Sequence, residues 1–313
     1  SRFWDFTKIK GIKGKQKIRK SKIFYKNLFL PGSKLNFGEN LLSKNNQEKA
    51  VTFISENGFR EERSWKQLNL NTSQILKFFK KTNIKKGDRV AAYMPNTIET
   101  VEAFIATTSL GCIWSSCSPD FGSKGVIERF SQINPKVLFI TDQYFYNGKK
   151  IDVLKRLPEI LKSIPSIKSV VISNYPGKKF IKKKFKFKKI NFFKWNKLMQ
   201  TNAEKINFKR FDFETELAIL YSSGTTGKPK CICHRSGGVL IQHMKEHQLH
   251  CNIKENDNVF YFTTCGWMMW NWLVSSLATK ASIVLFDGSP MFKSPDLLLK
   301  IAQREKITLF GIS

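Results

Sequence analysis

Short apolar runs alternate along this chain with longer mixed segments that are bounded by helix-capping and turn residues. The apolar runs predict strands at 51–54, 89–94, 137–141, 167–173, 217–220, 259–263, 282–286 and 308–313. The longer segments predict helices at 65–81, 96–109, 151–163 and 237–251, after residue 123, from about residue 267, and after Ser294 and Pro295. Strands and helices that take turns are typical of mostly parallel sheets covered by helices, so we expect the α/β class.

Polar residues at a fixed spacing mark the starts of two of these helices. Ser64, with Gln67 three residues later, predicts a capping box before the first helix. Asn96 and Glu99 have the same spacing and predict a capped start for the second helix.

The domain organisation is predicted from shifts in composition, because we see no internal repeat and no linker rich in Gly, Pro and Ser. Residues 1–47 are basic and aromatic with few periodic signals, and we expect them to form an N-terminal extension to a main domain that begins at residue 48. The lysine-rich run 178–189 is too charged for a core. We expect it to be an exposed hairpin or loop at a sheet edge, where lysine also blocks unwanted strand pairing.

The net charge of +30 raises the question of a nucleic-acid or anionic-lipid partner. The lysines are spread along the chain, however, and Asn, Ile and Phe are abundant with them, which compositional drift also produces. No recognised nucleic-acid module accompanies the charge, so we expect no nucleic-acid partner.

The cysteines indicate the cellular compartment of the protein, and one long uncharged stretch raises the question of a membrane span. The six cysteines form no C-x-x-C pair and no regular framework, so we expect thiols and a cytoplasmic protein. The uncharged stretch 258–279 is long enough to span a bilayer, but Thr, Gly, Asn and Ser residues interrupt it. We therefore expect a strand and a buried helix there, and no membrane span.

The most distinctive chemistry follows the apolar run 217–220. Residues 221–230 read Tyr-Ser-Ser-Gly-Thr-Thr-Gly-Lys-Pro-Lys. Glycines let a backbone approach a ligand closely, while hydroxyls, backbone N–H groups and lysines bind phosphate. The nucleoside-triphosphate P-loop is excluded, because it needs four residues between its glycines and Ser or Thr after its lysine. We predict a phosphate-binding loop, with a flexible surface turn as the alternative. Its candidate residues are Ser222, Ser223, Gly224, Thr225, Thr226, Gly227, Lys228 and Lys230.

This loop resembles the phosphate-binding signature of the adenylate-forming enzymes, the superfamily of acyl-CoA synthetases, luciferases and peptide-synthetase adenylation domains. Three further segments, at 29–42, 111–122 and 262–271, are similar to acyl-CoA synthetases that activate small acids. They read Phe-Leu-Pro-Gly-Ser-Lys-Leu-Asn-Phe-Gly-Glu-Asn-Leu-Leu, Gly-Cys-Ile-Trp-Ser-Ser-Cys-Ser-Pro-Asp-Phe-Gly and Phe-Thr-Thr-Cys-Gly-Trp-Met-Met-Trp-Asn. The likeness extends over nearly the whole chain.

The resemblance implies a ligase that uses ATP with Mg²⁺, and CoA as co-substrate. A carboxylate, acetoacetate in this case, attacks the α-phosphate, pyrophosphate leaves, and the CoA thiol captures the acyl-adenylate. Carboxylate and triphosphate repel until their charge is neutralised, and the 222–230 loop is expected to neutralise the β- and γ-phosphates. Acetate or propionate is the alternative acid. A basic fragment that binds nucleic acid or lipid without activity is the alternative of another class.

The resemblance also implies an acyl pocket bordered by Trp267, Met268 and Met269. Bulky walls suit a small β-keto acid, whereas an ordinary core helix is the alternative, since aromatic stripes usually pack in cores. His234, just after the loop, is a candidate for the edge of the site or for a structural hydrogen bond.

Three histidines, His243, His247 and His250, fall on one face of a predicted helix, as zinc ligands also do. Their order does not match the metalloprotease pattern H-E-x-x-H, so we expect no metal site there.

The chain departs from this superfamily in its length. The complete enzymes are considerably longer, and their adenine, ribose and magnesium motifs, and the lysine of their C-terminal domain, have no match in residues 1–313. We therefore expect an N-terminal fragment in which 48–313 is the first part of the adenylation domain, incomplete at its C-terminal side. The C-terminal domain would be absent and the catalytic residues would lie outside the chain. Alone, the chain is expected to bind ATP weakly and to form no acyl-CoA. The sequence does not indicate an oligomeric state.

Overall fold

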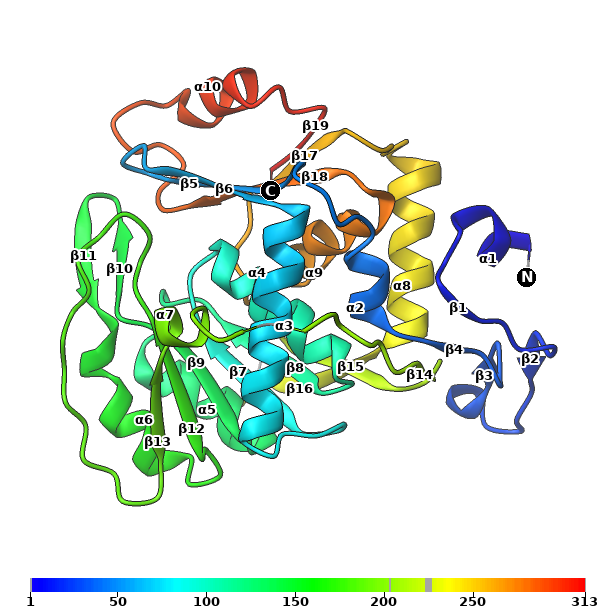
Figure 1. Ribbon diagram of the computed structural model, residues 1–313, viewed down its shortest axis with the longest axis horizontal. Coiled ribbons are helices and arrows are strands. Elements are labelled where there is room, and N and C mark those ends of the chain that lie inside the picture. Colours follow the sequence, from blue (N-terminus) through cyan, green and yellow to red (C-terminus); the bar gives the residue numbers. More distant parts are fainter. Residues whose placement is uncertain (1, 203, 223–226, 313) are drawn as a thin grey trace.

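The computed structural model describes residues 2–202, 204–222 and 227–312, and two larger β-sheets dominate it (Figure 1). The seven-stranded sheet consists, in spatial order, of β13 (Asn191–Lys194), β12 (Ser169–Ser173), β9 (Val137–Thr141), β7 (Arg89–Tyr93), β8 (Ile113–Cys117), β15 (Glu216–Ser222) and β16 (Lys230–Arg235). The five-stranded sheet consists of β19 (Leu309–Gly311), β17 (Asn258–Tyr261), β18 (Ser282–Asp287), β5 (Lys49–Ser55) and β6 (Arg60–Ser64). Neighbouring strands are parallel except in the pairs β15/β16 and β5/β6, so the predicted α/β class with mostly parallel sheets is confirmed.

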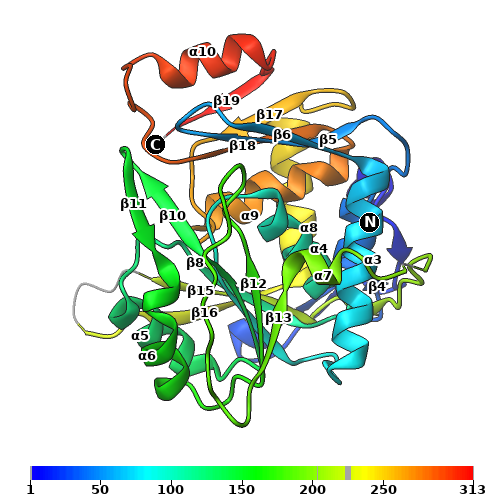
Figure 2. The same cartoon turned by 60° about the vertical axis from the view of Figure 1, so that its left-hand side comes forward.

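Helices cover both larger sheets and fill the space between them (Figures 1 and 2). They are α1 (Arg2–Thr7), α2 (Phe37–Leu41), α3 (Trp65–Lys81), α4 (Ile98–Ser109), α5 (Ser123–Ile133), α6 (Leu157–Ser163), α7 (Trp195–Leu198), α8 (Ser236–Lys245), α9 (Met268–Ser275) and α10 (Leu297–Arg304). Single-turn segments are η1 (Phe24–Lys26), η2 (Val153–Lys155), η3 (Glu246–His250, a π-turn that continues α8) and η4 (Ser276–Thr279). Helix α9 lies between the two sheets (Figure 2), where most of its side chains are buried.

Three small sheets complete the fold. Near the N-terminus, β4 (Lys34–Leu35) pairs with β1 (Gly11–Ile12) and with β14 (Phe211–Asp212). The other two are hairpins: β2 (Ile18–Arg19) with β3 (Leu28–Phe29), and β10 (Gln143–Tyr146) with β11 (Lys149–Asp152). Because β14 comes far downstream, the N-terminal residues are tied into the main domain by strand pairing.

Helix α3 shows how directly local sequence signals can determine an element. The Ser64 hydroxyl accepts a hydrogen bond from Gln67 N at 3.2 Å, and the Gln67 side chain accepts one from Ser64 N at 3.0 Å. These bonds satisfy two backbone donors that a helix start otherwise leaves without partners, an effect worth about 1 kcal/mol. The predicted capping box and the helix end at Lys81 are both confirmed.

The predicted cap at Asn96 is wrong. Thr97 precedes helix α4 and makes no side-chain cap bond. The buried Asn96 amide instead accepts a hydrogen bond from Trp270 Nε1 at 2.8 Å and donates one to the Phe286 carbonyl at 3.1 Å. Its backbone N–H donates to Asp287 Oδ1 at 3.0 Å. Asn96, Trp270 and Asp287 therefore join the two larger sheets, and we call this buried cluster the seam.

The predicted 151–163 helix is also wrong in its first part. Residues 149–152 belong to the β10/β11 hairpin, whose turn is formed by Asn147 and Gly148 at φ values of 50° and 74°. The Glu56 carboxylate accepts hydrogen bonds from the N–H groups of both turn residues, at 2.7 and 2.8 Å. An Asn-Gly pair is a strong hairpin signal, and here it overrides the helix.

The lysine-rich run 178–189 is a loop, one of the two forms predicted, and no strand forms in it. Its side chains alternate in exposure, so that Phe180, Phe185 and Phe187 pack against the core while lysines between them face solvent. The Asp142 carboxylate accepts a hydrogen bond from Ile181 N at 2.8 Å and fixes the loop beside the sheet.

The uncharged stretch 258–279 forms β17, α9 and η4, so the predicted strand and buried helix are confirmed. Among the residues that the structure describes, no helix is long and apolar enough to cross a membrane. All six cysteines are free thiols, as predicted, and three of them (Cys112, Cys117 and Cys265) are buried.

Candidate functional site

The predicted phosphate loop connects two antiparallel strands. Ser222 closes β15 and pairs with Lys230, the first residue of β16. Four of the predicted residues, Ser223, Gly224, Thr225 and Thr226, lie outside the described residues, and their contacts stay predictions. Gly227 has a φ of 101°, which a residue with a side chain rarely adopts. Lys228 and Lys230 are exposed and form no ion pair within the described ranges, so both ammonium groups are available to an anion.

Strand β16 was not predicted from the sequence. Its side chains are mostly exposed, including Cys231, Ile232 and Cys233, so no apolar alternation marks it as a strand. It forms because its backbone pairs with β15 over residues 216–222. The loop is therefore held at both ends by the edge of the seven-stranded sheet.

Helix α5 supports the base of this loop. Gln132 Nε2 donates a hydrogen bond to the Pro229 carbonyl at 2.9 Å. The Tyr221 hydroxyl donates to the Arg129 carbonyl at 3.2 Å and accepts from Ser115 Oγ at 3.1 Å. Burial raises the pKa of Tyr221 well above its usual value, so this phenol stays neutral and acts as a hydrogen-bonding support.

Arg129 was missed in the sequence analysis, although it links the two predicted parts of the site. Its guanidinium lies 4.4 Å from the centroid of the Phe121 ring and 5.7 Å from that of Tyr221, distances at which cation–π attraction acts. Phe121 in turn lies beside Gly266, where an added Cβ would stand 3.6 Å from its ring. Tyr221 lies 92 residues from Arg129, and Gly266 lies 145 residues from Phe121, so these two contacts leave no local signal.

The turn at Gly266 lies against the end of β8. The Ser116 hydroxyl donates a hydrogen bond to the Cys265 carbonyl at 2.5 Å, and Ser118 N lies 3.6 Å from where a Cβ on Gly266 would be. Since β8 and β15 are parallel neighbours, their carboxyl ends meet at one edge of the sheet, which we call the carboxyl edge. Ser222, residues 227–230 and the 266–269 turn lie there, where open α/β sheets bind their ligands.

The three predicted pocket residues open helix α9 at this edge. Trp267 precedes the helix and is 54% exposed, Met268 is 44% exposed, and Met269 is half-buried. Trp270 differs, because it is buried and stacks on Trp114 with ring centroids 6.3 Å apart. Aromatic core packing thus accounts for Trp270 but leaves Trp267 and Met268 open to a ligand; their role in a pocket stays a prediction.

His234 is half-buried within β16, opposite Ala218. It lies four residues from Lys230, which is roughly 13 Å along a strand at about 3.3 Å per residue. Burial lowers its pKa, so the imidazole is neutral at pH 7. The structure thus separates it from the loop along the strand, and its place at the edge of the site stays a prediction.

His243 and His247 share one hydroxyl. Ser275 Oγ lies 2.8 Å from His243 Nδ1 and 3.0 Å from His247 Nε2, and it donates its own hydrogen to the Trp272 carbonyl at 2.7 Å. Both rings must therefore donate to Ser275. Burial lowers the pKa of His243 to about 4 and that of His247 to about 3. The third histidine, His250, is exposed, and the described part of the chain holds no group of three His, Cys, Asp or Glu residues placed to bind a metal.

The seam contains a buried carboxyl group just beneath the carboxyl edge. Asp287 accepts hydrogen bonds from Asn96 N at 3.0 Å and from the Tyr175 hydroxyl at 2.9 Å. Burial raises its pKa to about 7 despite these two bonds. No basic side chain is hydrogen-bonded to Asp287 in the described residues, so no cation offsets the cost of ionising this buried carboxyl group.

Comparison with known proteins shows which family and which relatives this chain is similar to. The family described as AMP-binding enzyme matches residues 42–312. The acetoacetyl-coenzyme A synthetase of Rhizobium meliloti (strain 1021) is 41% identical over 310 residues, which are 99% of this chain and 47% of that protein. The acetoacetyl-CoA synthetase of Gallus gallus is 43% identical over 294 residues, which are 90% of this chain and 43% of that protein.

A solved structure supports the same likeness. The structure of the acetoacetyl-CoA synthetase from Streptomyces lividans matches this chain with a TM-score of 0.91, and the two sequences are 32% identical. The match covers 99% of this chain and 47% of that one. The chain therefore spans about half the length of the curated relatives it matches.

Proposed function

Because the chain belongs to the AMP-binding enzyme family, we propose that it forms part of an ATP-dependent ligase that joins acetoacetate to coenzyme A. In this reaction the acetoacetate carboxylate attacks the α-phosphorus of ATP, and pyrophosphate leaves with the electrons of the broken P–O bond. The CoA thiol then attacks the carbonyl carbon of the acyl-adenylate, which releases AMP and leaves a thioester. Since the chain spans about half of its relatives' length, it would contribute only part of the machinery.

One observation carries the proposal: Lys228 and Lys230, beside the start of β16, and the turn with Trp267, against the end of β8, lie at the same carboxyl edge. Arg129, through its contacts with Tyr221 and Phe121, connects the base of the loop to that turn. A triphosphate on the loop and a small acid at the turn would thus approach each other across the end of β8. Such positioning lowers the barrier between two reactants that otherwise meet rarely.

The loop residues would supply the electrostatic part of the reaction. Lys228 and Lys230 would pair with the β- and γ-phosphates, and the Gly227 turn would let backbone N–H groups face them. This arrangement would stabilise the charge that develops on the departing pyrophosphate.

Mg²⁺ is proposed to enter with the nucleotide. This ion keeps several waters and is commonly held by one or two carboxylates together with substrate phosphates. When bound, Mg²⁺ would neutralise phosphate charge.

Acetoacetate is the acid we favour because the three relatives above carry its name. Trp267 and Met268, both exposed at the carboxyl edge, would form a short, bulky wall beside it. Acetate and propionate are the competing acids, and a wall of this kind excludes long acyl chains.

A hybrid enzyme tests the proposal. Residues 1–313 of this chain would be joined to the part of the Rhizobium meliloti relative that follows its matched region. We expect the hybrid to release pyrophosphate when given acetoacetate, ATP and Mg²⁺, and to form acetoacetyl-CoA when CoA is added. A well-folded hybrid, checked by circular dichroism, that releases pyrophosphate equally well without any acid would overturn the assignment. The rates with acetate and propionate identify the preferred acid.

A further inference from the structure

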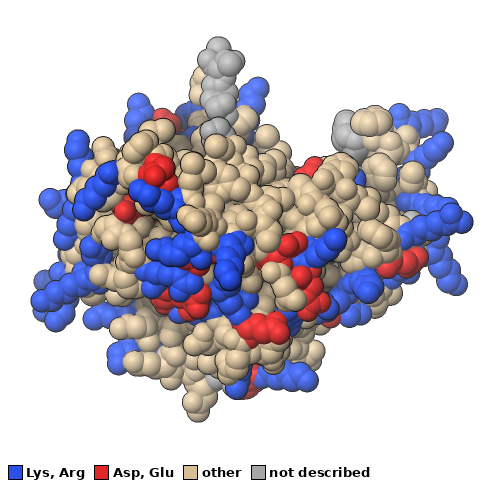
Figure 3. All heavy atoms as spheres, turned by 90° about the horizontal axis from the view of Figure 1, so that it is seen from above, with Lys and Arg blue, Asp and Glu red and all other residues tan. Residues whose placement is uncertain are grey.

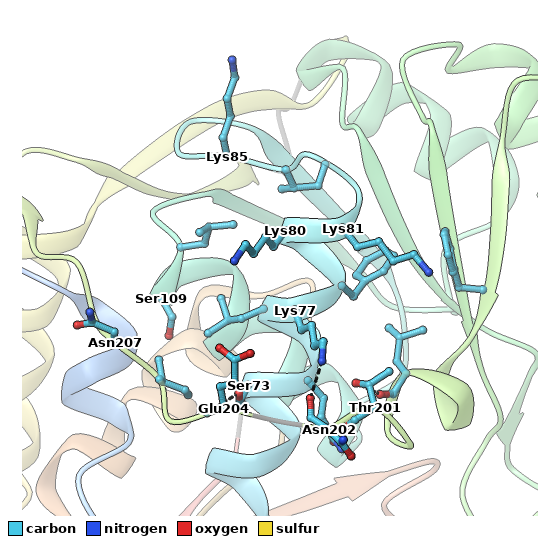
Figure 4. Close-up of a pocket in the computed structure, with 18 of the residues that line it drawn as sticks. Ser73, Lys77, Lys80, Lys81, Lys85, Ser109, Thr201, Asn202, Glu204 and Asn207 are labelled. Carbon is cyan, nitrogen blue, oxygen red and sulfur yellow. Dashed lines mark hydrogen bonds between the residues drawn. The ribbon is translucent and has the colours of Figure 1, made fainter.

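A large groove lies away from the carboxyl edge, against the outer face of helix α3 (Figure 4). Its volume is about 1490 Å³. One wall is the second half of α3 with the turn that precedes β7, and the other wall is formed by residues within 192–202 and 204–211. None of the residues placed in the candidate site lines this groove.

The groove is lined by lysines that have no acidic partners. Nine lysines line it, whereas Glu204 is the single carboxylate among the lining residues. The nine are Lys77, Lys80, Lys81, Lys85, Lys86, Lys194, Lys197, Lys205 and Lys209. Within the described ranges none of them forms an ion pair, although lysines elsewhere do, such as Lys136 with Asp88 at 2.7 Å and Lys183 with Asp152 at 2.6 Å.

The abundance of basic residues in the whole chain does not by itself explain the number of lysines that line the groove. Lys and Arg together make up 54 of the 313 residues, about one in six, but lysine accounts for nine of the 25 residues that line the groove. On another face of the molecule, acidic side chains lie among the basic ones (Figure 3). A cleft with walls of one charge and a low dielectric floor concentrates the field and attracts counter-ions.

The floor beneath these lysines is apolar and aromatic. Phe78 and Phe193 meet edge to face with ring centroids 5.0 Å apart, and Lys86 lies 5.3 Å from the centroid of the Phe211 ring. Further floor residues are Leu76, Ile84, Leu110, Phe192, Leu198 and Ile206. The groove therefore offers apolar surface at its base and positive charge around its rim.

The wall opposite α3 is held in place by specific hydrogen bonds. Gln74 Nε2 donates to the carbonyls of Met199 and Thr201 at 2.8 and 2.9 Å. Ser73 Oγ donates to the Glu204 carbonyl at 2.6 Å, and Lys77 Nζ donates to the Asn202 carbonyl at 3.1 Å (Figure 4). Both Ser73 and Gln74 are more than nine-tenths buried, so the bonds that these two side chains donate are largely shielded from water, whereas the Lys77 bond is exposed.

We propose that this groove binds a free amphiphilic anion of the long-chain acyl-CoA class, with its acyl chain on the apolar floor and its phosphates among the lysines. Nine cations distributed over two walls suit a head with several phosphates better than a single phosphate. The Phe192, Phe193 and Phe211 rings suit a planar base and an alkyl chain. A bilayer presents the same chemistry, but its flat surface does not enter a concave groove. The inference is independent of the function proposed above, because the two sites share no residues.

Calorimetric titration of the 313-residue chain with palmitoyl-CoA, kept below the concentration at which it forms micelles, tests this inference. We expect one molecule to bind per chain and the affinity to fall as salt rises. Lys77→Glu combined with Lys197→Glu, one lysine from each wall, should weaken binding at least tenfold. The milder pair Lys77→Gln and Lys197→Gln should weaken it about threefold.

Matched controls make the test decisive. Lys182→Glu with Lys184→Glu makes the same change in charge on the exposed 178–189 loop and should leave the affinity within twofold. CoA and palmitate, titrated separately, should each bind at least tenfold more weakly than palmitoyl-CoA. The inference is overturned if the two double-Glu variants weaken binding equally, if CoA alone binds as tightly, or if only phosphatidylglycerol vesicles bind. Thermal melting of each variant verifies its fold.

Discussion

Two tryptophans three residues apart show how differently the seam and the carboxyl edge are built. Trp270, in the seam, is buried, stacks on Trp114 and donates its indole hydrogen to Asn96. Trp267, at the carboxyl edge, is 54% exposed at the start of the same helix. In the seam most polar groups are satisfied within the protein, whereas at the edge cations and aromatic faces are left open. Residues of the seam should therefore determine the stability of the fold, and residues at the carboxyl edge should determine ligand binding.

The largest expected effect that tests this contrast is on stability. Trp270→Ala removes a buried ring and leaves the Asn96 amide without a donor, so we expect the free energy of unfolding to fall by about 3–5 kcal/mol. Trp267→Ala, the matched control, should change it by less than about 1 kcal/mol, because the ring is largely in water. Urea unfolding followed by circular dichroism measures both. Equal losses in the two variants would contradict the contrast.

The next effect is on catalysis in the hybrid enzyme. Lys228→Ala removes one exposed cation from the loop, so we expect acetoacetate-dependent pyrophosphate release to fall about 100-fold with no change in stability. Lys182→Ala, on the exposed 178–189 loop, is the control and should release pyrophosphate at the unaltered rate. A normal rate in the Lys228 variant would show that the loop does not act on the nucleotide.

The seam should also respond to pH, through Asp287. Its pKa is raised to about 7 in the folded state, while an unfolded aspartate titrates near 3.9. Between these values the unfolded chain loses a proton that the folded chain keeps. As the pH rises from about 4 to about 7, Asp287 therefore lowers the free energy of unfolding by up to about 1.4 kcal/mol per pH unit. Above pH 7 it causes no further change.

Asp287→Asn should remove this contribution, and the difference between wild type and variant isolates it from other titrating groups. His243 and His247 act in the opposite direction: their lowered pKa values make stability rise with pH between about 4 and 6.5. Denaturant titrations at pH 4 to 8 measure these slopes. A difference curve that is flat over the whole range would mean that Asp287 is ionised in the seam.

The smallest expected effect concerns the choice of acid. In the hybrid, Trp267→Ala should change the preference for acetoacetate over acetate by about fivefold, since a pocket wall contributes roughly 1–3 kcal/mol of discrimination per small group. Met291→Ala, another exposed apolar residue but outside the edge, serves as the control. An unchanged preference in the Trp267 variant would mean that this side chain does not form a wall of the acid pocket.

Elements with local signals could be predicted from the sequence, and those that depend on distant partners could not. The α3 capping box lies within four residues, and the β9 strand is a run of four apolar residues closed by Thr141; both were predicted correctly. The Asn96 cap failed because its side chain bonds Trp270, 174 residues away. Strand β16 exists only through its pairing with β15, which its exposed side chains do not reveal.

The same distinction holds within the candidate site. The loop and the Trp267 turn carry recognisable residue patterns, and both were identified from sequence. Arg129 was missed because its partner Tyr221 lies 92 residues downstream. The Asn147 and Gly148 hairpin, by contrast, had a local signal that was not used.

The pairing of β4 with β14 limits how early β4 can reach its final place during synthesis. Leu35 lies opposite Phe211, so β4 must wait during synthesis for a partner made 176 residues later. At about 5–20 residues per second, that delay is roughly 9–35 seconds. During this interval Leu35 and the residues around it lack their final neighbours and are exposed to chaperones and proteases. Strand β4 is thus made well before its small sheet can be completed.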